Sequence, residues 1–306
     1  MGCEMTLADP FGREVTGLRI AITARCNLRC LYCHHEGEEV RSSGGREISP
    51  EEIVEVISAG ASLGVKRVKL TGGEPLMRRD LEEILMRLPD GLEISLTTNG
   101  TLLAGRAGPL ADAGLDRVNV SLDSLNPRVY RRITGGTEED LKRVLAGIDG
   151  ALEAGLLPVK VNMVILKENE GEVWDMVKLA RDRGVVLQLI ELLDRSGRGI
   201  GGGIAGIEAA LDREAEDVVT RDMHWRRKYF LSGAEVEVVR PMDNTEFCAH
   251  CNRLRVTSDG RLKPCLLRND NLIDLAGADG EETKRRIEKA VGLRSPYFCE
   301  KRREGR

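Results

Sequence analysis

Short apolar runs rich in β-branched residues alternate, over the first two thirds of the chain, with segments whose apolar residues recur at helical spacing. Runs of this length are typical of buried strands, and their alternation with helical segments predicts parallel βαβ units. We expect strands at 17–23, 67–71, 92–97, 117–122, 159–166 and 185–192. We expect the intervening helices at 50–63, 80–88, 102–113, 138–154 and 171–183.

Helix boundaries support this pattern. Ser49 and Pro50 are suited to the N-cap and the first turn of a helix, because a serine side chain can accept from an orphan amide and proline has no amide to satisfy. Several helices are followed by a glycine, which favours the left-handed conformation of a C-terminal cap: Gly64, Gly114, Gly155 and Gly184. We predict an α/β fold, a partial (β/α)6 TIM-like barrel of parallel strands.

The pattern changes after residue 192. A glycine-rich stretch is followed by short strand candidates at 234–240, 253–258 and 261–265. We therefore predict a barrel over residues 1–205 and a smaller C-terminal extension over residues 206–306 that closes it.

Charge and composition exclude several classes of protein. The chain has 306 residues, and its 46 Lys plus Arg against 50 Asp plus Glu give a net charge of −4, which calls for neither nucleic acid nor an anionic membrane. No apolar stretch is long enough to cross a bilayer, and the N-terminus lacks a signal pattern, so we expect a cytoplasmic protein. In a reducing cytosol its eight cysteines favour metal binding or catalysis over disulfides.

Cys26, Cys30 and Cys33 directly follow the first predicted strand. Structural zinc and ordinary cubane clusters are closed by four ligands, whereas a cluster with three thiolates leaves one iron open for another ligand. Spacing alone leaves alternatives open: a zinc site completed by His34 or His35, or unrelated thiols.

A second triplet lies in the extension, at Cys248, Cys251 and Cys265. It again offers three thiolates, and the alternative is a zinc ribbon completed by His250, although a histidine adjacent to Cys251 is poorly placed to close the same tetrahedron. The remaining cysteines, Cys3 and Cys299, lie near the termini and have no assigned role.

Residues 23–33, Thr-Ala-Arg-Cys-Asn-Leu-Arg-Cys-Leu-Tyr-Cys, resemble the signature of the radical S-adenosylmethionine (SAM) enzymes. Residues 71–75, Thr-Gly-Gly-Glu-Pro, match the glycine-rich edge that this resemblance places after the second strand. In that superfamily the open iron chelates the amino and carboxylate groups of SAM.

The resemblance extends, from about residue 12 to residue 265, to the MoaA-type GTP 3′,8-cyclases of molybdenum-cofactor biosynthesis. It is carried by the segments 18–20, 69–81, 97–100, 119–123 and 160–162, and by Cys251-x-Arg253-x-Arg255. It implies a lyase with two 4Fe-4S clusters, held by Cys26, Cys30 and Cys33 and by Cys248, Cys251 and Cys265. A 5′-deoxyadenosyl radical formed from SAM then removes hydrogen from ribose C3′ of GTP, and C3′ joins guanine C8.

Cations at strand positions are candidates for binding the triphosphate. Arg253 and Arg255 alternate on a strand and so face one side, while Arg19, Lys69 and Lys160 are unusual residues to place inside a barrel. Each of them could instead lie on a solvated face or snorkel to the surface. The resemblance assigns all five to GTP together with Thr97, and we treat Arg19, Arg253 and Arg255 as the candidate catalytic residues.

The same resemblance places Tyr32, Gly73 and Ser121 beside SAM. Two positions depart from the family: Gln188 stands where an arginine commonly lies near the SAM carboxylate, and Leu193 where a methionine lies near its adenine. We expect Leu193 still to contact SAM, less tightly. Many members also end in a Gly-Gly tail, whereas this sequence ends Arg-Glu-Gly-Arg.

The expected partners are GTP, SAM, an unidentified electron donor and, further along the pathway, cyclic pyranopterin monophosphate synthase. We expect no membrane and no nucleic acid partner, and the oligomeric state is open, with a homodimer as one alternative. Two other functions remain: a radical SAM enzyme with an auxiliary cluster that modifies a peptide or a tetrapyrrole, and a zinc-stapled α/β binding module.

Overall fold

The computed structural model describes residues 6–38, 46–194, 197–242 and 244–297. Within them a single sheet has the strand order β12-β11-β10-β1-β2-β3-β4-β5-β6-β9-β8-β7. Its first six strands run parallel in chain order: β1 (Gly17–Ala21), β2 (Arg67–Thr71), β3 (Glu93–Thr98), β4 (Arg117–Ser121), β5 (Lys160–Ile165) and β6 (Val186–Glu191). The predicted α/β fold and partial parallel barrel are confirmed.

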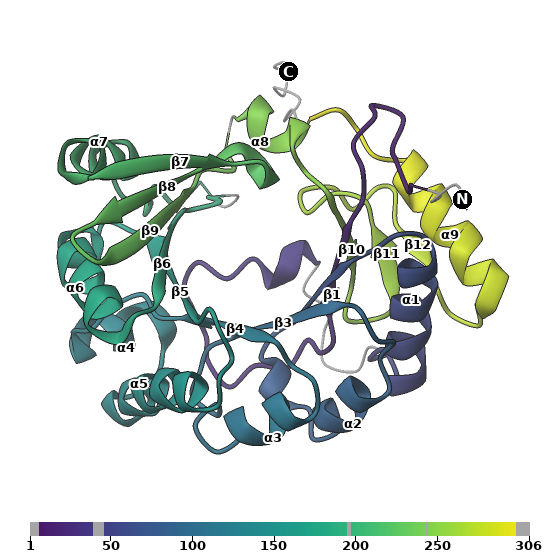
Figure 1. The fold of residues 1–306 in the computed structure, drawn as a ribbon, viewed down its shortest axis with the longest axis horizontal. Coiled ribbons are helices and arrows are strands. Elements are labelled where there is room, and N and C mark those ends of the chain that lie inside the picture. The colour runs from purple at the N-terminus through teal and green to yellow at the C-terminus, as the bar shows by residue number, and fades with distance from the viewer. Residues whose placement is uncertain (1–5, 39–45, 195–196, 243, 298–306) are drawn as a thin grey trace.

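The C-terminal region extends both ends of this sheet. β10 (Arg253–Val256) lies parallel to β1, and β9 (Ala234–Val239) lies parallel to β6. Antiparallel strands then follow at each end: β11 (Arg261–Lys263) and β12 (Ile273–Asp274) beyond β10, and β8 (Arg226–Leu231) and β7 (Asp217–Arg221) beyond β9. The result is a curved, open sheet around a central lumen (Figure 1). The division between residues 205 and 206 stays a prediction.

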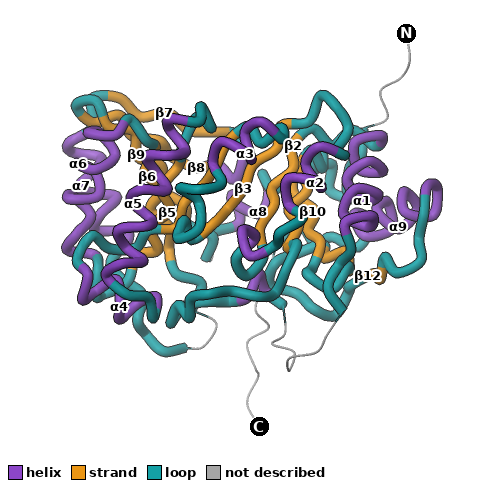
Figure 2. Tube along the Cα trace, turned by 90° about the horizontal axis from the view of Figure 1, so that it is seen from below, coloured by secondary structure: helices purple, strands orange, loops and turns teal. Residues whose placement is uncertain are grey.

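Helices cover the outer face of the sheet, in the front and side views (Figures 1 and 2). They are α1 (Pro50–Ser62), α2 (Leu81–Met86), α3 (Ala107–Asp112), α4 (Pro127–Thr134), α5 (Glu138–Glu153), α6 (Val173–Arg183), α7 (Ile204–Glu214) and α9 (Gly280–Gly292). The short helix α8 (Thr245–Ala249) lies instead at the opening between the two ends of the sheet (Figure 1). Ser49 caps α1 in a reciprocal capping box with Glu52, as its place in the sequence predicts. Gly184 ends α6 with φ 66°, in the left-handed conformation.

One predicted helix is shorter than expected. The segment 102–113 becomes helical only at Ala107, two residues before Pro109. Proline has no amide and clashes with the preceding turn, so it is tolerated in a first turn but not further inside a helix. The proline therefore sets where α3 begins, and the residues before it form turns.

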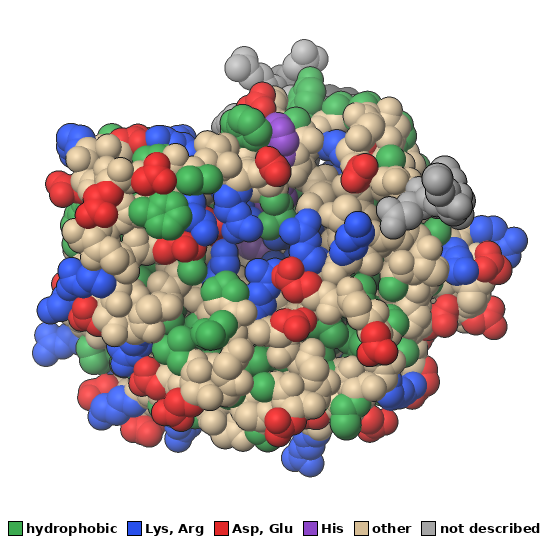
Figure 3. All heavy atoms as spheres, viewed as in Figure 1, with side chains coloured by type: hydrophobic (Ala, Val, Ile, Leu, Met, Phe, Trp, Pro, Cys, Tyr) green, Lys and Arg blue, Asp and Glu red, His purple; other side chains and the backbone are tan. Residues whose placement is uncertain are grey.

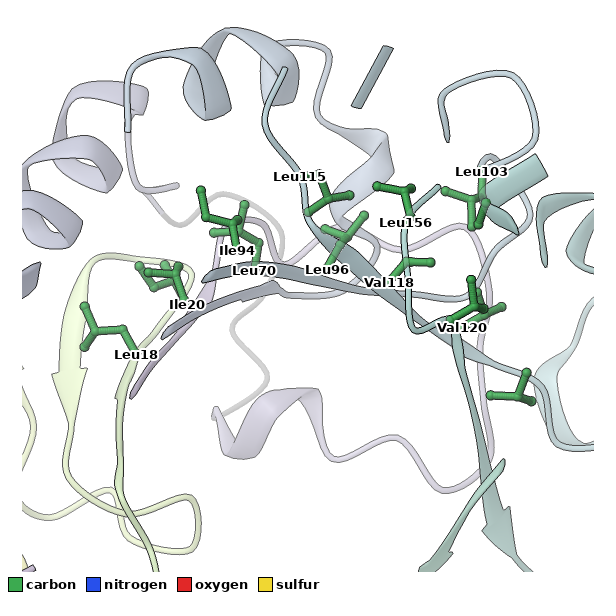
Figure 4. Close-up of a cluster of buried hydrophobic side chains, with 14 of the residues drawn as sticks. Leu18, Ile20, Leu70, Ile94, Leu96, Leu103, Leu115, Val118, Val120 and Leu156 are labelled. Carbon is green, nitrogen blue, oxygen red and sulfur yellow. The ribbon is translucent and has the colours of Figure 1, made fainter. Parts of the chain in front are cut away.

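Alternate residues of each parallel strand face opposite sides of the sheet. Leu18, Ile20 and Leu70 are fully buried and point toward the helices (Figure 4). The intervening Arg19 and Lys69 must then face the lumen, because side chains alternate along a strand. The lumen of this barrel is consequently lined by polar and charged side chains, whereas its apolar core lies between sheet and helices.

Candidate active site

Strand direction places the two cysteine triplets at opposite ends of the lumen. Cys26 follows the carboxyl end of β1, whereas Cys251 precedes the amino end of β10, and these two strands are parallel neighbours. Cys265 follows β11, which runs antiparallel to β10 and so ends beside Cys251. Anything bound in the lumen would lie between the triplets.

The thiols of the first triplet lie near enough to influence one another's charge. The electrostatic influence of Cys33 contributes to the raised pKa of both Cys26 and Cys30, although burial is the larger cause for each. Backbone amides point at the sulfurs, since the amides of Leu28 and His35 lie 3.5 Å from the Sγ atoms of Cys26 and Cys33. Three neighbouring sulfurs with amide donors suit an iron–sulfur cluster.

The glycine-rich edge packs directly against the residues leading to Cys26. A Cβ on Gly73 would lie 2.2 Å from the carbonyl oxygen of Arg25, and the Gly73 amide donates to the carbonyl oxygen of Thr23 at 2.7 Å. The buried Glu74 carboxylate accepts from the Thr98 hydroxyl and the Asn99 amide, both at 2.7 Å. These glycines are thus required by close backbone packing that fixes the first triplet.

Two arginines hold the backbone of the second triplet. Arg13 donates to the carbonyl oxygen of Cys248 at 2.8 Å, and Arg294 donates to that of Cys251 at 2.5 Å. The buried carboxylate of Asp9 bridges them, with Oδ2 lying 2.6 Å from Arg13 Nε and 3.0 Å from Arg294 Nη1. The segment before β1 and the residues after α9 therefore position the cysteines of the extension.

A cavity of about 260 Å³ occupies the lumen. All three cysteines of the second triplet line it, together with Arg19, Lys69, Thr97, Leu193, Arg253 and Arg255. His34 Nδ1, Thr97 Oγ1 and Asn162 Oδ1 also face it from residues that line it, and these buried atoms have no hydrogen-bond partner among the described residues. Unpaired buried polar atoms are costly, so the cavity is suited to a polar ligand that would satisfy them.

Positive charge dominates this cavity. Eight Lys or Arg residues line it against one carboxylate, that of Glu36, counted over the residues the structure describes. Lys and Arg side chains gather around the hollow in the face that Figure 3 shows. Burial, reinforced by Arg19 and Arg253, lowers the pKa of Lys69 well below its ordinary value. A site that desolvates several like charges is built to receive an anion.

The residues predicted for the substrate line two adjoining spaces. Arg19, Lys69, Thr97, Arg253 and Arg255 are brought together at the cavity, and their role in binding the substrate stays a prediction. Lys160 instead lines a smaller adjoining space of about 120 Å³, which Lys69 and Arg253 also border.

Lys160 belongs to a buried ion network centred on Glu237 of β9. Its Nζ lies 3.0 Å from Glu237 Oε2, and Arg221, Arg226 and the Gln188 amide also contact that carboxylate. Burial lowers the pKa of Lys160 to about 8, against the opposing effect of Glu237. Gln188 and Arg226 both also line the cavity, Arg226 from β8.

Replacing Glu237 with glutamine is expected to lower the free energy of unfolding by about 3–5 kcal/mol, because it leaves buried cations without a counter-ion. The carboxylate is fully buried. Glu235→Gln is the matched control on the same strand, since its partner Lys228 is half-buried and the expected loss is below about 1 kcal/mol. Urea unfolding of anaerobically purified protein measures both, and equal losses would contradict the assigned network.

The contribution of Glu237 to the free energy of unfolding should depend on pH. Burial raises the pKa of Glu237, but the charges of Arg226 and Lys160 outweigh it and hold the pKa below its usual range. The stabilisation is therefore present above the ordinary pKa of a glutamate and lost as the pH falls below it. The difference between wild type and Glu237→Gln should shrink in acid.

Residues predicted to lie beside SAM do not all reach the cavity. Leu193 lines it, whereas Tyr32, Gly73 and Ser121 do not. The Tyr32 hydroxyl donates to Asp123 Oδ2 at 2.6 Å, which connects the first triplet to the end of β4. Burial raises the pKa of Asp123 to about 6.

Several site residues were not predicted. His224 lines the cavity, and its ring stacks on that of Phe247, the residue before Cys248, with 3.9 Å between the ring centroids.

His250, the alternative zinc ligand, does not line the cavity and stacks on Trp225 instead. No group of three His, Cys, Asp or Glu side chains in the described segments has the geometry to hold a single metal ion.

Comparison with known proteins decides the family. Residues 20–180 match the radical SAM superfamily, and residues 204–298 match the family described as Molybdenum Cofactor Synthesis C. A protein of Methanosarcina mazei named "Probable GTP 3′,8-cyclase" is 53% identical over 96% of this chain and 91% of its own length. The chain belongs to the GTP 3′,8-cyclase family. Another member so named, from Methanothermobacter marburgensis, is 50% identical over 96% of this chain and 99% of its own.

The cofactors of this GTP 3′,8-cyclase family member are two 4Fe-4S clusters and SAM, and its thiols fit the clusters. All six are present as cysteines rather than half-cystines. Among solved structures, Streptococcus suis SuiB bound to its precursor peptide SuiA has a TM-score of 0.67 at 16% identity, covering 95% of this chain and 68% of SuiB, a likeness of fold alone. No helix in the described segments has the length and apolar character needed to cross a membrane.

Proposed function

We propose that this chain converts GTP to (8S)-3′,8-cyclo-7,8-dihydroguanosine 5′-triphosphate, the first step of molybdenum-cofactor biosynthesis. The observation that carries the proposal is the cation-lined cavity in a lumen with a three-cysteine group at each end. A triphosphate needs such a concentration of cations, and two groups each lacking a fourth cysteine suit two bound small molecules.

In this proposal the first cluster is held by Cys26, Cys30 and Cys33, and the second by Cys248, Cys251 and Cys265. When bound, the clusters and SAM supply the radical chemistry at ribose C3′ and the iron that holds guanine. The protein contributes position and a lumen shielded from water. Each cluster group is fixed by its own contacts, the first by the glycine-rich edge and the second by the arginines on its carbonyl oxygens.

The triphosphate is assigned to Arg19, Lys69, Arg253 and Arg255. Arg255 is the direct neighbour of Arg19 in the sheet, and Lys69 is the neighbour of Arg19 on the other side. Since all three face the lumen at one level, they form a row of donors across three strands. Thr97 is assigned to the substrate because its buried hydroxyl has no hydrogen-bond partner among the described residues. Lys160 lies outside this row of donors and forms an ion pair with the Glu237 carboxylate.

SAM is assigned to the end of the lumen nearer the first triplet. Tyr32 and Gly73 lie on the loops that follow β1 and β2, and Ser121 ends β4, so all three are at the carboxyl ends of the strands. Leu193 lies two residues beyond the end of β6, at the same end. The position of these four residues at one end of the lumen supports a contact of each with SAM.

The test is incubation of the anaerobically reconstituted protein with SAM, dithionite and GTP. The proposal expects a cyclised nucleotide, together with 5′-deoxyadenosine whose formation depends on GTP. Formation of 5′-deoxyadenosine regardless of GTP, without cyclised nucleotide, would refute it. About eight irons per reconstituted chain are expected for two 4Fe-4S clusters.

The remaining assignments follow from this chemistry. We place the enzyme in the cytoplasm, supported by cysteines kept as thiols. An electron donor must supply the reducing equivalents, and cyclic pyranopterin monophosphate synthase would receive the product. The oligomeric state, with a homodimer among the alternatives, stays a prediction.

A further inference from the structure

Glu36 is a carboxylate placed among the cations assigned to the substrate. Its Oε1 lies 2.5 Å from Arg19 Nη2, and its Oε2 lies 2.9 Å from Arg19 Nε and 3.2 Å from Arg255 Nη1. The Thr71 hydroxyl donates to the same carboxylate at 3.1 Å. None of the segments that carry the family resemblance includes this residue, and the proposed reaction does not use it.

The segment carrying Glu36 is tied down on both sides. It begins directly after Cys33, the Gly37 carbonyl oxygen accepts from Lys263 Nζ at 3.0 Å, and Glu38 accepts from the amide and hydroxyl of Ser258 at 2.8 and 2.6 Å. A Cβ on Gly37 would lie 2.2 Å from the Leu266 carbonyl oxygen. The segment thus links the first triplet to the region of β10 and β11, the strands that lie between Cys251 and Cys265.

The backbone of this segment is strained at Glu36 and at the residue before it. His35 and Glu36 both have positive φ, 48° and 52°, a conformation that is unfavourable for residues other than glycine. The surrounding contacts hold two such residues in sequence, which indicates that the position of the Glu36 side chain matters to the site.

Electrostatics explain what the carboxylate does in the free protein. Arg19 and Arg255 are neighbours on adjacent strands, and burial together with the charge of Arg19 lowers the pKa of Arg255. Glu36 bridges them and is the single acid among the described residues that line the cavity. It therefore screens a repulsion that would otherwise be unopposed while the lumen holds no anion.

We propose that Glu36 is an internal counter-ion. It pairs with Arg19 and Arg255 in the free enzyme, and phosphate oxygens of the substrate replace it as the partner of these arginines when the substrate binds. The inference rests on the proposed function, because it assigns those arginines to the triphosphate of GTP. A ligand must then carry enough negative charge to replace a carboxylate already in place, so Glu36 selects for a triphosphate over less charged forms of the same nucleoside.

Neutralising Glu36 should tighten anion binding and weaken the free protein. For Glu36→Gln we expect the Kd for GTP to fall about tenfold, since one nearby negative charge is removed from a partly screened site. Without ligand, its melting temperature should fall below that of wild type. Glu38→Gln is the matched control, because Glu38 lies on the same segment but contacts Ser258 and no cavity cation; its Kd should stay within twofold of wild type.

The measurement is equilibrium binding of GTP, GMP and inorganic triphosphate to anaerobic, cluster-loaded protein without SAM or reductant. The ratio of GMP to GTP dissociation constants should also change in Glu36→Gln and not in Glu38→Gln. An unchanged or higher Kd for GTP and triphosphate in Glu36→Gln would overturn the proposal, because a residue that merely orients the arginines would weaken binding when altered.

Failure of the proposed function would look different. If GTP binds to neither wild type nor variant, the substrate assignment is wrong, while inorganic triphosphate still reports on Glu36. Should Glu36→Gln fail to fold, Glu36→Asp shortens the side chain while retaining the charge. Because aspartate would contact the arginines less closely, the Kd for triphosphate should fall, by a smaller factor than in Glu36→Gln. An unchanged or higher Kd would again reject the role of Glu36 as a counter-ion.

Discussion

Replacing Arg253 and Arg255 together by alanine is expected to lower kcat/KM for cyclisation at least about 10³-fold while both clusters still assemble. Each side chain faces the lumen beside the second triplet, and a hydrogen bond to a charged group is worth about 1.5–3 kcal/mol, so two lost contacts compound. Iron and sulfide analysis gives cluster content, and product formation under SAM and dithionite gives activity.

Arg261→Ala is the matched control for this variant. Arg261 lies on β11, the neighbour of β10, but pairs with Asp259 and does not line the cavity. It should retain activity within about twofold, as expected for a partly exposed ion pair. If the double variant bound GTP as tightly as wild type, these two arginines would not be the triphosphate site.

Serine substitution in the two cysteine triplets should separate two activities. Cys30→Ser is expected to remove about half of the iron and abolish cleavage of SAM, because a three-thiolate cluster cannot lose a ligand and stay bound. Cys265→Ser should also lose about half of the iron, yet still cleave SAM to 5′-deoxyadenosine without forming cyclised nucleotide. The physical reason is that Cys265 lies at the opposite end of the lumen from Cys30.

Cys3→Ser and Cys299→Ser serve as controls for these variants. Both residues lie outside the described residues, and neither is part of a triplet. They should retain full iron content and activity. Loss of SAM cleavage in both triplet variants alike, with all iron gone, would mean that the chain holds one shared centre rather than two.

Much of the barrel could be predicted because its signals are local. All six parallel strands lie where apolar β-branched runs place them, with boundaries within two residues. Local signals were also present in elements that were not predicted. Asn126 and Pro127 cap and open α4, and α9 buries Ile287, Ala290 and Val291 at helical spacing. What periodicity could not give is that β9 and β10 join opposite ends of one sheet, since this depends on contacts far apart in sequence.

The candidate site divides in the same way. The cysteines and the cations of β1, β2 and β10 are found from spacing and strand alternation, and the structure brings these cations together with the second triplet around one cavity. Glu36 and Arg255, by contrast, are 219 residues apart, so no local pattern pairs them. Glu237 carried a usable signal, an acid between Val236 and Val238, but its partners come from four other strands.

We place GTP in the lumen with its ribose within reach of the radical formed from SAM. The most direct measurement uses GTP deuterated at C3′ in the reaction with SAM and dithionite, followed by mass spectrometry of both products. We expect 5′-deoxyadenosine carrying one deuterium, formed together with cyclised nucleotide that has lost it. Deuterium-free 5′-deoxyadenosine beside intact, fully labelled GTP would rule out this placement of the ribose.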